Sequence, residues 1–84
     1  MTKARDLKAQ AHALKPVVRV GQKGLTEEVK IEINAALDHH ELIKIKLVAD
    51  RDQRTRWVEQ LVRECEAEHI GSIGQITILY KQAQ

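Results

Sequence analysis

Apolar residues recur along the chain with two different periods, and these periods predict alternating helices and strands. Spacings of three and four residues predict amphipathic helices over three segments, 2–14, 27–39 and 53–68. Alternation of apolar and polar residues predicts strands over 17–20, 42–48 and 75–81, with a further short strand beginning at His69. This order favours an α/β fold, an α+β sandwich in which helices cover a sheet with some parallel pairing.

The apolar phase of each element also predicts one main core. Its expected members are Val18, Val20, Val29, Ile33, Leu37, Ile43, Ile45, Trp57, Leu61, Ile76 and Ile78. The first helix carries its own narrow stripe of Leu7, Ala11 and Leu14. Thr77 and Leu79 fall on the opposite phase of the last strand, and residues 71–74 supply turn residues before it. Trp57 lies on the apolar stripe of its helix, which favours a core residue over a platform for stacking bases.

The stretch Gly21-Gln22-Lys23-Gly24 joins the first strand to the second helix. Glycine admits positive φ and lets another molecule approach the backbone without a Cβ in the way. Thr26 is a good N-cap for the helix, whose first N–H groups and partial positive charge attract an anion. Together with Lys23, these groups could hold a phosphate. The alternative interpretation is a tight strand-to-helix connection without a ligand.

The net charge of +2 hides an asymmetry along the chain. Residues 1–26 carry a net charge of +5 and residues 27–84 a net charge of −3. The basic residues of the first part are Lys3, Arg5, Lys8, Lys15, Arg19 and Lys23. Such clustering is typical of a site for a polyanion, although an ordinary solvated helix face would look the same.

Two further groups of basic residues lie outside this region. Arg51, Arg54 and Arg56 crowd the start of the third helix, where cations oppose the helix dipole unless Asp50 and Asp52 offset them. They form either a second binding surface or a solvated face. Lys44 and Lys46 share one face of the second strand, where they either protect an exposed edge or extend a basic surface.

Composition limits the class of protein. A chain of 84 residues, 43% hydrophobic and 31% charged, is expected to form one folded domain over 1–84. No apolar run approaches the ~20 residues of a membrane span, and no apolar signal core follows the polar N-terminus. The lone Cys65 excludes an internal disulfide and fits a reducing compartment. We therefore expect a cytoplasmic protein without membrane contact.

Catalytic motifs are not evident, so we expect a protein that is not an enzyme and needs no metal or cofactor. The glycine turn lacks the lysine-serine pair of a nucleotide-binding P-loop. Cys65 lies in an apolar stripe without an activating base. The histidines, His12, His39, His40 and His69, show no triad or metal-ligand spacing.

With these elements placed, residues 15–26 (KPVVRVGQKGLT) resemble the signature of the CRM domain, the chloroplast RNA splicing and ribosome maturation domain. Its single-domain bacterial members are the YhbY-like proteins. Three further stretches agree in kind and order, namely residues 35–37 with 40–46, the helix with Trp57, and residues 73–81. The resemblance thus covers nearly the whole chain.

The resemblance implies an RNA-binding domain similar in fold to the C-terminal domain of bacterial translation initiation factor three. It implies a four-stranded mixed sheet with three helices, in the order helix-strand-helix-strand-helix-strand-strand, and a G-x-x-G loop like that of KH domains. Bacterial members of the family are associated with precursors of the large ribosomal subunit. Gln22 is a departure, because family loops often carry basic residues at both positions between the glycines.

Residues and resemblance together predict an RNA-binding surface. Its expected members are Gly21, Gln22, Lys23, Gly24, Lys15, Arg19, Lys8, Arg51, Arg54 and Arg56. The expected partner is structured RNA, either ribosomal RNA or a pre-50S particle, recognised by shape and phosphates, with the protein acting as a monomer. The alternative is a protein-interaction module that docks on a ribosomal protein or an assembly factor.

Overall fold

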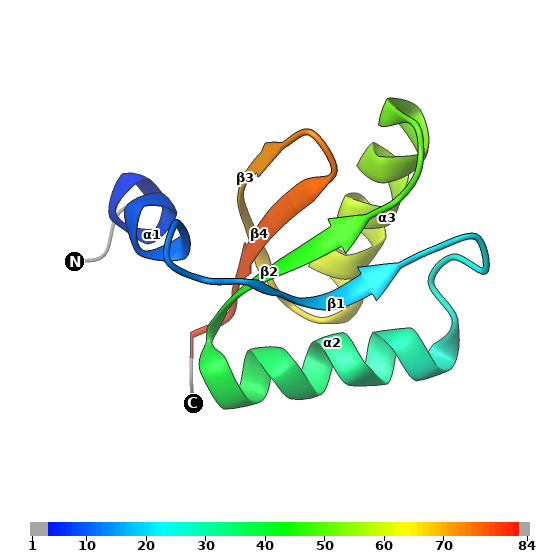
Figure 1. Cartoon of the computed structure of the whole chain (residues 1–84). Helices are drawn as coiled ribbons and strands as arrows, with labels where there is room; N and C mark the ends of the chain where they lie inside the picture. Colours follow the sequence, from blue (N-terminus) through cyan, green and yellow to red (C-terminus); the bar gives the residue numbers. More distant parts are fainter. Residues whose placement is uncertain (1–3, 83–84) are drawn as a thin grey trace.

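The structure is a computed structural model that describes residues 4–82. Helices and strands alternate along the chain, and two consecutive strands follow the last helix (Figure 1). The elements are α1 (Ala4–Ala11), β1 (Pro16–Val20), α2 (Glu27–His40), β2 (Leu42–Leu47), α3 (Arg51–Glu64), β3 (Glu68–Ile73) and β4 (Ile76–Tyr80). The predicted order of elements is confirmed. Thr2 and Lys3, at the predicted start of the first helix, lie outside the described residues.

The four strands form one mixed sheet in the order β1-β2-β4-β3. β1 and β2 are parallel and are connected through α2, while β4 pairs antiparallel with both β2 and β3. α2 and α3 pack on one face of the sheet and α1 packs on the other. Among the described residues, the expected four-stranded mixed sheet with three helices is therefore confirmed.

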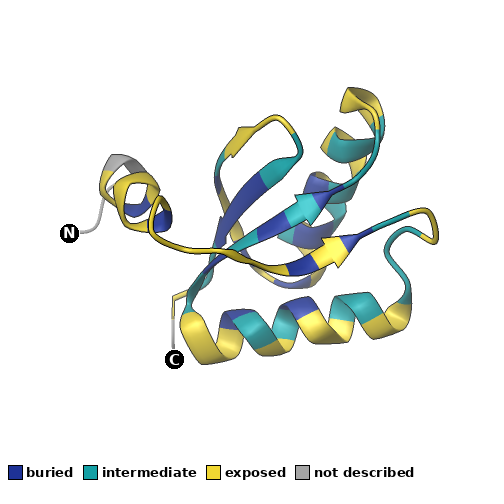
Figure 2. Cartoon of the chain, in the orientation of Figure 1, coloured by how far each residue is buried: buried dark blue, intermediate teal, exposed yellow. Residues whose placement is uncertain are grey.

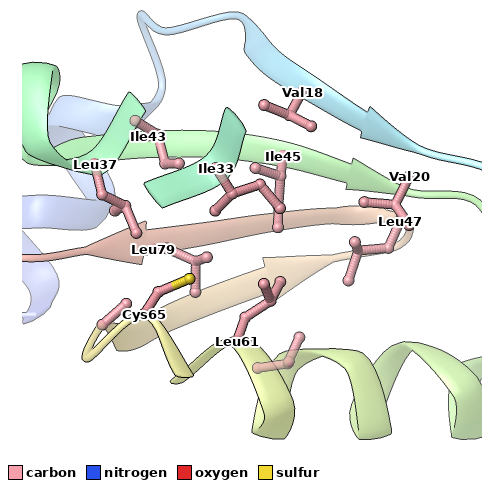
Figure 3. Packing of buried hydrophobic residues seen from close by; sticks show 12 residues of the cluster. Val18, Val20, Ile33, Leu37, Ile43, Ile45, Leu47, Leu61, Cys65 and Leu79 are labelled. Carbon is pink, nitrogen blue, oxygen red and sulfur yellow. The ribbon is translucent and has the colours of Figure 1, made fainter. Parts of the chain in front are cut away.

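The main core lies between the sheet and the helices α2 and α3. Because side chains alternate along a strand, every second residue of β2, and Val18 and Val20 of β1, face these helices and are buried (Figure 2). The core residues are Val18, Val20, Ile33, Leu37, Ile43, Ile45, Leu47, Val58, Leu61, Cys65, Ala67 and Leu79. Figure 3 shows how side chains from both helices meet the inner face of the sheet. The predicted burial of the first two strands is confirmed.

A second, smaller core on the other face corrects the expectation of one main core. It consists of Leu7, Ala11, Ile70 and Ile78, with Leu42 and Tyr80 packed against it. β4 contributes to both cores, since Leu79 and Thr77 are buried on the α2–α3 face and Ile78 is buried beneath α1. Ile76, predicted as core, is only half-buried. A strand covered on both faces has no single buried phase, which is why alternation misassigned β4.

Several predicted boundaries also change. α1 ends at Ala11, so Leu14 lies beyond the helix, and this residue is 37% exposed. Asp50 is the N-cap of α3, accepting a hydrogen bond from the Gln53 backbone N–H at 2.8 Å. α3 therefore begins and ends earlier than predicted. Gly71 belongs to β3, and the turn before β4 is formed by residues 74 and 75.

No helix of the described chain is both long and apolar enough to cross a bilayer. Over residues 4–82, no group of three or more histidine, cysteine, aspartate or glutamate side chains is placed to hold a metal ion.

Candidate nucleic-acid interface

The G-x-x-G loop is a tight turn between β1 and α2. The Gly24 backbone N–H donates to the Gly21 carbonyl at 3.0 Å, and the Thr26 N–H donates to the Gly24 carbonyl at 3.0 Å. Gly24 has a φ of 74°, in the left-handed region that glycine adopts without strain. Thr26 is the N-cap of α2, as predicted, and its hydroxyl accepts from the Val29 N–H at 3.2 Å. The loop therefore has a defined shape and leads directly to the capped start of α2.

Trp57 of α3 lies against this loop. A Cβ atom on Gly24 would lie 3.5 Å from Trp57 Cζ2 and 3.9 Å from its Nε1. The indole is half-buried and packs on the main core, whereas the sequence predicted that it would be mostly buried. The difference arises because Trp57 bridges two environments, with the core on one side and the loop on the other. Its contact with Gly24 ties the loop to α3.

A hollow of about 830 Å³ opens beside the loop. It is lined by Arg19, Gly21, Gln22, Lys23, Gly24, Thr26, Glu27, Glu28, Val29 and Val48. Arg19 of β1 reaches the loop, because its guanidinium Nη1 is 3.4 Å from the position of a Cβ on Gly21. Arg19 and Lys23 are exposed, and neither forms an ion pair with a side chain of residues 6–82. This hollow thus combines two exposed cations with the start of α2, where the exposed carboxylates Glu27 and Glu28 also line it.

Other cations are paired with carboxylates of α2 and α3. Lys30 Nζ lies 3.0 Å from carboxylate oxygens of both Glu27 and Glu64, and Lys81 Nζ lies 3.2 Å from Asp38 Oδ1. The hydrogen bond to Glu64, followed by that to Glu27, raises the pKa of Lys30, and the hydrogen bond from Lys30 lowers the pKa of Glu64. These cations are therefore engaged within the fold.

Cys65 lies in the main core, and the residue is only 4% exposed. Burial raises its pKa, so the reactive thiolate form is disfavoured.

Two of the three arginines at the start of α3 line a different hollow from the one beside the loop. Arg51 and Arg54 line a groove of about 530 Å³ between α3 and the β3–β4 hairpin, together with His69 and Ser72. Arg54 Nη1 donates to the Ala49 carbonyl at 2.6 Å. In the same helix, Arg56 Nη2 donates to Gln53 Oε1 at 2.9 Å. Two of the three arginines thus have local partners, and Arg51 is exposed in the groove.

Lys8 and Lys15 lie near α1 rather than near the loop. Lys8 of α1 is exposed, and its stem crosses Gly71 of β3 so closely that a Cβ there would collide with Lys8 Cε. Lys15 precedes β1 and Gly21 follows it, so the two lie roughly 20 Å apart at ~3.3 Å per strand residue. The predicted site residues therefore separate into three groups, at the loop, at the start of α3 and beside α1.

The structure also shows which strands flank Lys44 and Lys46, a question that the sequence left open. β2 lies between β1 and β4, so the interpretation that these lysines protect an edge strand is wrong. Lys44 Nζ donates to the Leu14 carbonyl at 3.1 Å. Lys46 is the register partner of Arg19 on β1. The alternation within residues 42–48 indicated that both lysines lie on one face of the strand. Only the strand order and register identify Arg19 as the neighbour of Lys46.

The chain resembles known proteins over nearly its whole length. It is 47% identical over 79 residues to a Haemophilus influenzae protein named RNA-binding protein, covering 93% of this chain and 80% of that one. It is 39% identical over 79 residues to a Pseudomonas aeruginosa protein named as a probable RNA-binding protein, covering 93% of this chain and 76% of that one.

A solved structure agrees with the fold. The solution structure of a hypothetical protein from Staphylococcus aureus superposes with a TM-score of 0.85 at 25% identity, covering 100% of this chain and 92% of that one. The family model described as the CRS1 / YhbY (CRM) domain matches residues 1–81. The chain therefore belongs to the CRS1/YhbY (CRM) domain family.

Proposed function

We propose that this protein binds RNA and that the G-x-x-G loop holds the sugar–phosphate backbone. The observation that carries the proposal is the loop itself, a glycine turn that opens beside the capped start of α2 with Lys23 and Arg19 exposed. Backbone N–H groups at a helix start and nearby cations are the groups that bind phosphate. The names of the two bacterial relatives support RNA as the ligand.

The wider basic surface defines which RNA we expect. Lys8 and Lys15 beside α1, and Arg51 with Arg54 and Arg56 at the start of α3, lie too far from one another to contact a single phosphate. A folded RNA presents phosphates on several sides, so different phosphates of one molecule could contact the basic groups beside α1 and at the start of α3. We therefore propose structured ribosomal RNA, within the pre-50S particle, as the partner, in agreement with the resemblance to YhbY-like proteins. In this role the protein acts as a cytoplasmic monomer and performs no catalytic step.

Base stacking on aromatic side chains contributes little in this proposal. Trp57 and Tyr80 are the only aromatic residues among phenylalanine, tyrosine and tryptophan in the chain. Trp57 packs beneath Gly24, and Tyr80 packs against the second core. Recognition would then depend mainly on phosphates and RNA shape.

A filter-binding titration with fragments of large-subunit ribosomal RNA tests the proposal. The variant is Lys23→Gln at the loop, and its matched control is Arg63→Gln in the exposed last turn of α3. Both remove one positive charge, so any difference reports position. We expect Lys23→Gln to weaken binding about three- to tenfold more than the control, the range of one solvent-exposed hydrogen-bonded contact. Equal, small effects in folded protein would contradict the loop as the phosphate site.

A further inference from the structure

One row of residues crosses all four strands on the sheet face opposite α2 and α3. Arg19 of β1 is paired with Lys46 of β2, Lys46 with Ile76 of β4, and Ile76 with Ile73 of β3. Their strand neighbours Val18, Val20, Ile45 and Leu47 are buried in the main core, so the row projects from the other face. The row therefore carries two cations on one half of the sheet and two isoleucines on the other.

This part of the face is not covered by α1. The helix packs on Ile70 and Ile78, further along the strands, and the loop between β1 and α2 lies at the end of the sheet away from α1 (Figure 1). Ile73 is accordingly 73% exposed. Arg19 and Lys46 are partners on adjacent strands, about 4.8 Å apart, and neither forms an ion pair with residues 6–82. Like charges so placed repel each other, and a bound anion would relieve that repulsion.

We propose that this row, Arg19–Lys46–Ile76–Ile73, binds a short single-stranded segment of the RNA whose backbone is held at the G-x-x-G loop. The inference rests on the proposed function and extends it to a second contact surface. Arg19 connects the two, because its guanidinium lies beside Gly21 while its backbone belongs to the row. The cations contact phosphates, and unpaired bases pack against Ile76 and Ile73.

The arrangement of charge and apolar surface favours this ligand. A single strand presents phosphates along its backbone and flat, unstacked base faces, and bases pack against apolar as well as aromatic side chains. An RNA duplex presents phosphates but keeps its bases stacked inside. The two isoleucines should therefore distinguish single-stranded from double-stranded RNA, while the two cations should contribute to the binding of both.

Fluorescence anisotropy with the full chain tests the inference. The probes are a labelled single-stranded uridine oligonucleotide and a labelled RNA duplex of equal length. We expect Ile73→Ser to weaken single-strand binding about fivefold, as loss of one apolar contact would, without changing its salt dependence or duplex binding. We expect Lys46→Gln to make the log–log salt slope for the single strand shallower by about 0.7, the loss of one phosphate contact.

The chain supplies a matched control for each variant. Ile31 of α2 is 66% exposed and is not on the sheet, so Ile31→Ser makes the same change elsewhere on the surface. Arg63→Gln is the control for Lys46→Gln. We expect both controls to bind like the unaltered protein. Ile73→Phe adds a gain-of-function measurement, because an aromatic ring at this site should tighten single-strand binding.

Specific results would overturn the inference. If Ile73→Ser binds single strands as well as Ile31→Ser does, or weakens duplex binding equally, the isoleucines do not contact bases. If RNA affinity is unchanged in both sheet variants while Lys23→Gln lowers it, the loop is the RNA site and the sheet face serves another partner, such as an acidic protein segment. Loss of binding in the sheet variants but not in Lys23→Gln would instead contradict the proposed function of the loop.

Discussion

Gly24 lies directly against the indole of Trp57, with only 3.5 Å between Trp57 Cζ2 and the position that a Cβ on Gly24 would occupy. One residue belongs to the loop after β1 and the other to α3, so the contact joins segments that are distant along the chain. The glycine with a φ of 74° thus packs against a half-buried indole from another element. The shape of the proposed phosphate site is consequently coupled to the packing of α3.

Gly24→Ala should destabilise the protein by about 1–2 kcal/mol, because a side chain at positive φ is strained. Gly74→Ala is the matched control, since Gly74 also has positive φ, 58°, but no atom within 4 Å of an added Cβ. We expect similar losses of unfolding free energy in urea for both variants. Only Gly24→Ala should also weaken RNA binding. An unchanged stability of Gly24→Ala would contradict the conformation described for the loop.

Trp57→Ala should lower the unfolding free energy by roughly 3 kcal/mol, near the lower end for a large aromatic residue because the indole is only half-buried. RNA affinity should fall as well, since the loop loses its support. Trp57→Phe should retain much of the unfolding free energy and of the RNA affinity that Trp57→Ala loses. A variant that loses RNA affinity with full stability would indicate that the indole contacts RNA directly.

Lys23→Glu should weaken RNA binding strongly while changing the unfolding free energy by no more than about 0.5 kcal/mol, as for an ordinary exposed position. Arg63→Glu reverses the same charge at the far end of α3 and serves as the control. Lys30 is unsuitable for this purpose because its ion pairs with Glu27 and Glu64 would be lost. Equal loss of affinity in Lys23→Glu and Arg63→Glu would mean that overall charge alone governs binding.

The affinity for RNA should fall steeply with salt. Four phosphate contacts on single-stranded RNA predict a log–log slope near −3, from about −0.7 for each contact. Titrations at several salt concentrations measure this slope. An affinity that is independent of salt would favour docking on a protein instead.

The ion pair between Lys30 and Glu64 should make stability depend on pH. Its hydrogen bond lowers the pKa of Glu64 in the folded protein. The stabilisation is therefore fully present above the pKa that Glu64 has in the unfolded chain, and it is lost as the pH falls through the pKa of Glu64 in the folded protein. The pKa of Lys30 is raised, so its contribution is lost only at strongly alkaline pH. The difference in Tm between the unaltered protein and Glu64→Gln should therefore shrink below about pH 4. A difference that stays constant with acidification would contradict this.

The sequence by itself determined what depends on near neighbours in the chain. Alternation assigned the buried faces of β1 and β2, because both strands are covered by α2 and α3 on the same side. The N-cap Thr26 and the glycines that follow β1 placed the G-x-x-G loop and the start of α2. These features rest on local backbone preferences, which residues a few positions apart control.

Only the tertiary structure decided which distant residues meet. α1 covers part of the second sheet face, so both phases of β4 are buried, and Trp57 packs under Gly24 instead of deep in the core. The pairing of Arg19 with Lys46 likewise follows from the parallel register of β1 and β2. Periodicity shows that a residue has a buried or an exposed side, but it does not show which element covers that side. Strand order and register determine which element covers each side, because they bring together segments that are far apart in the chain.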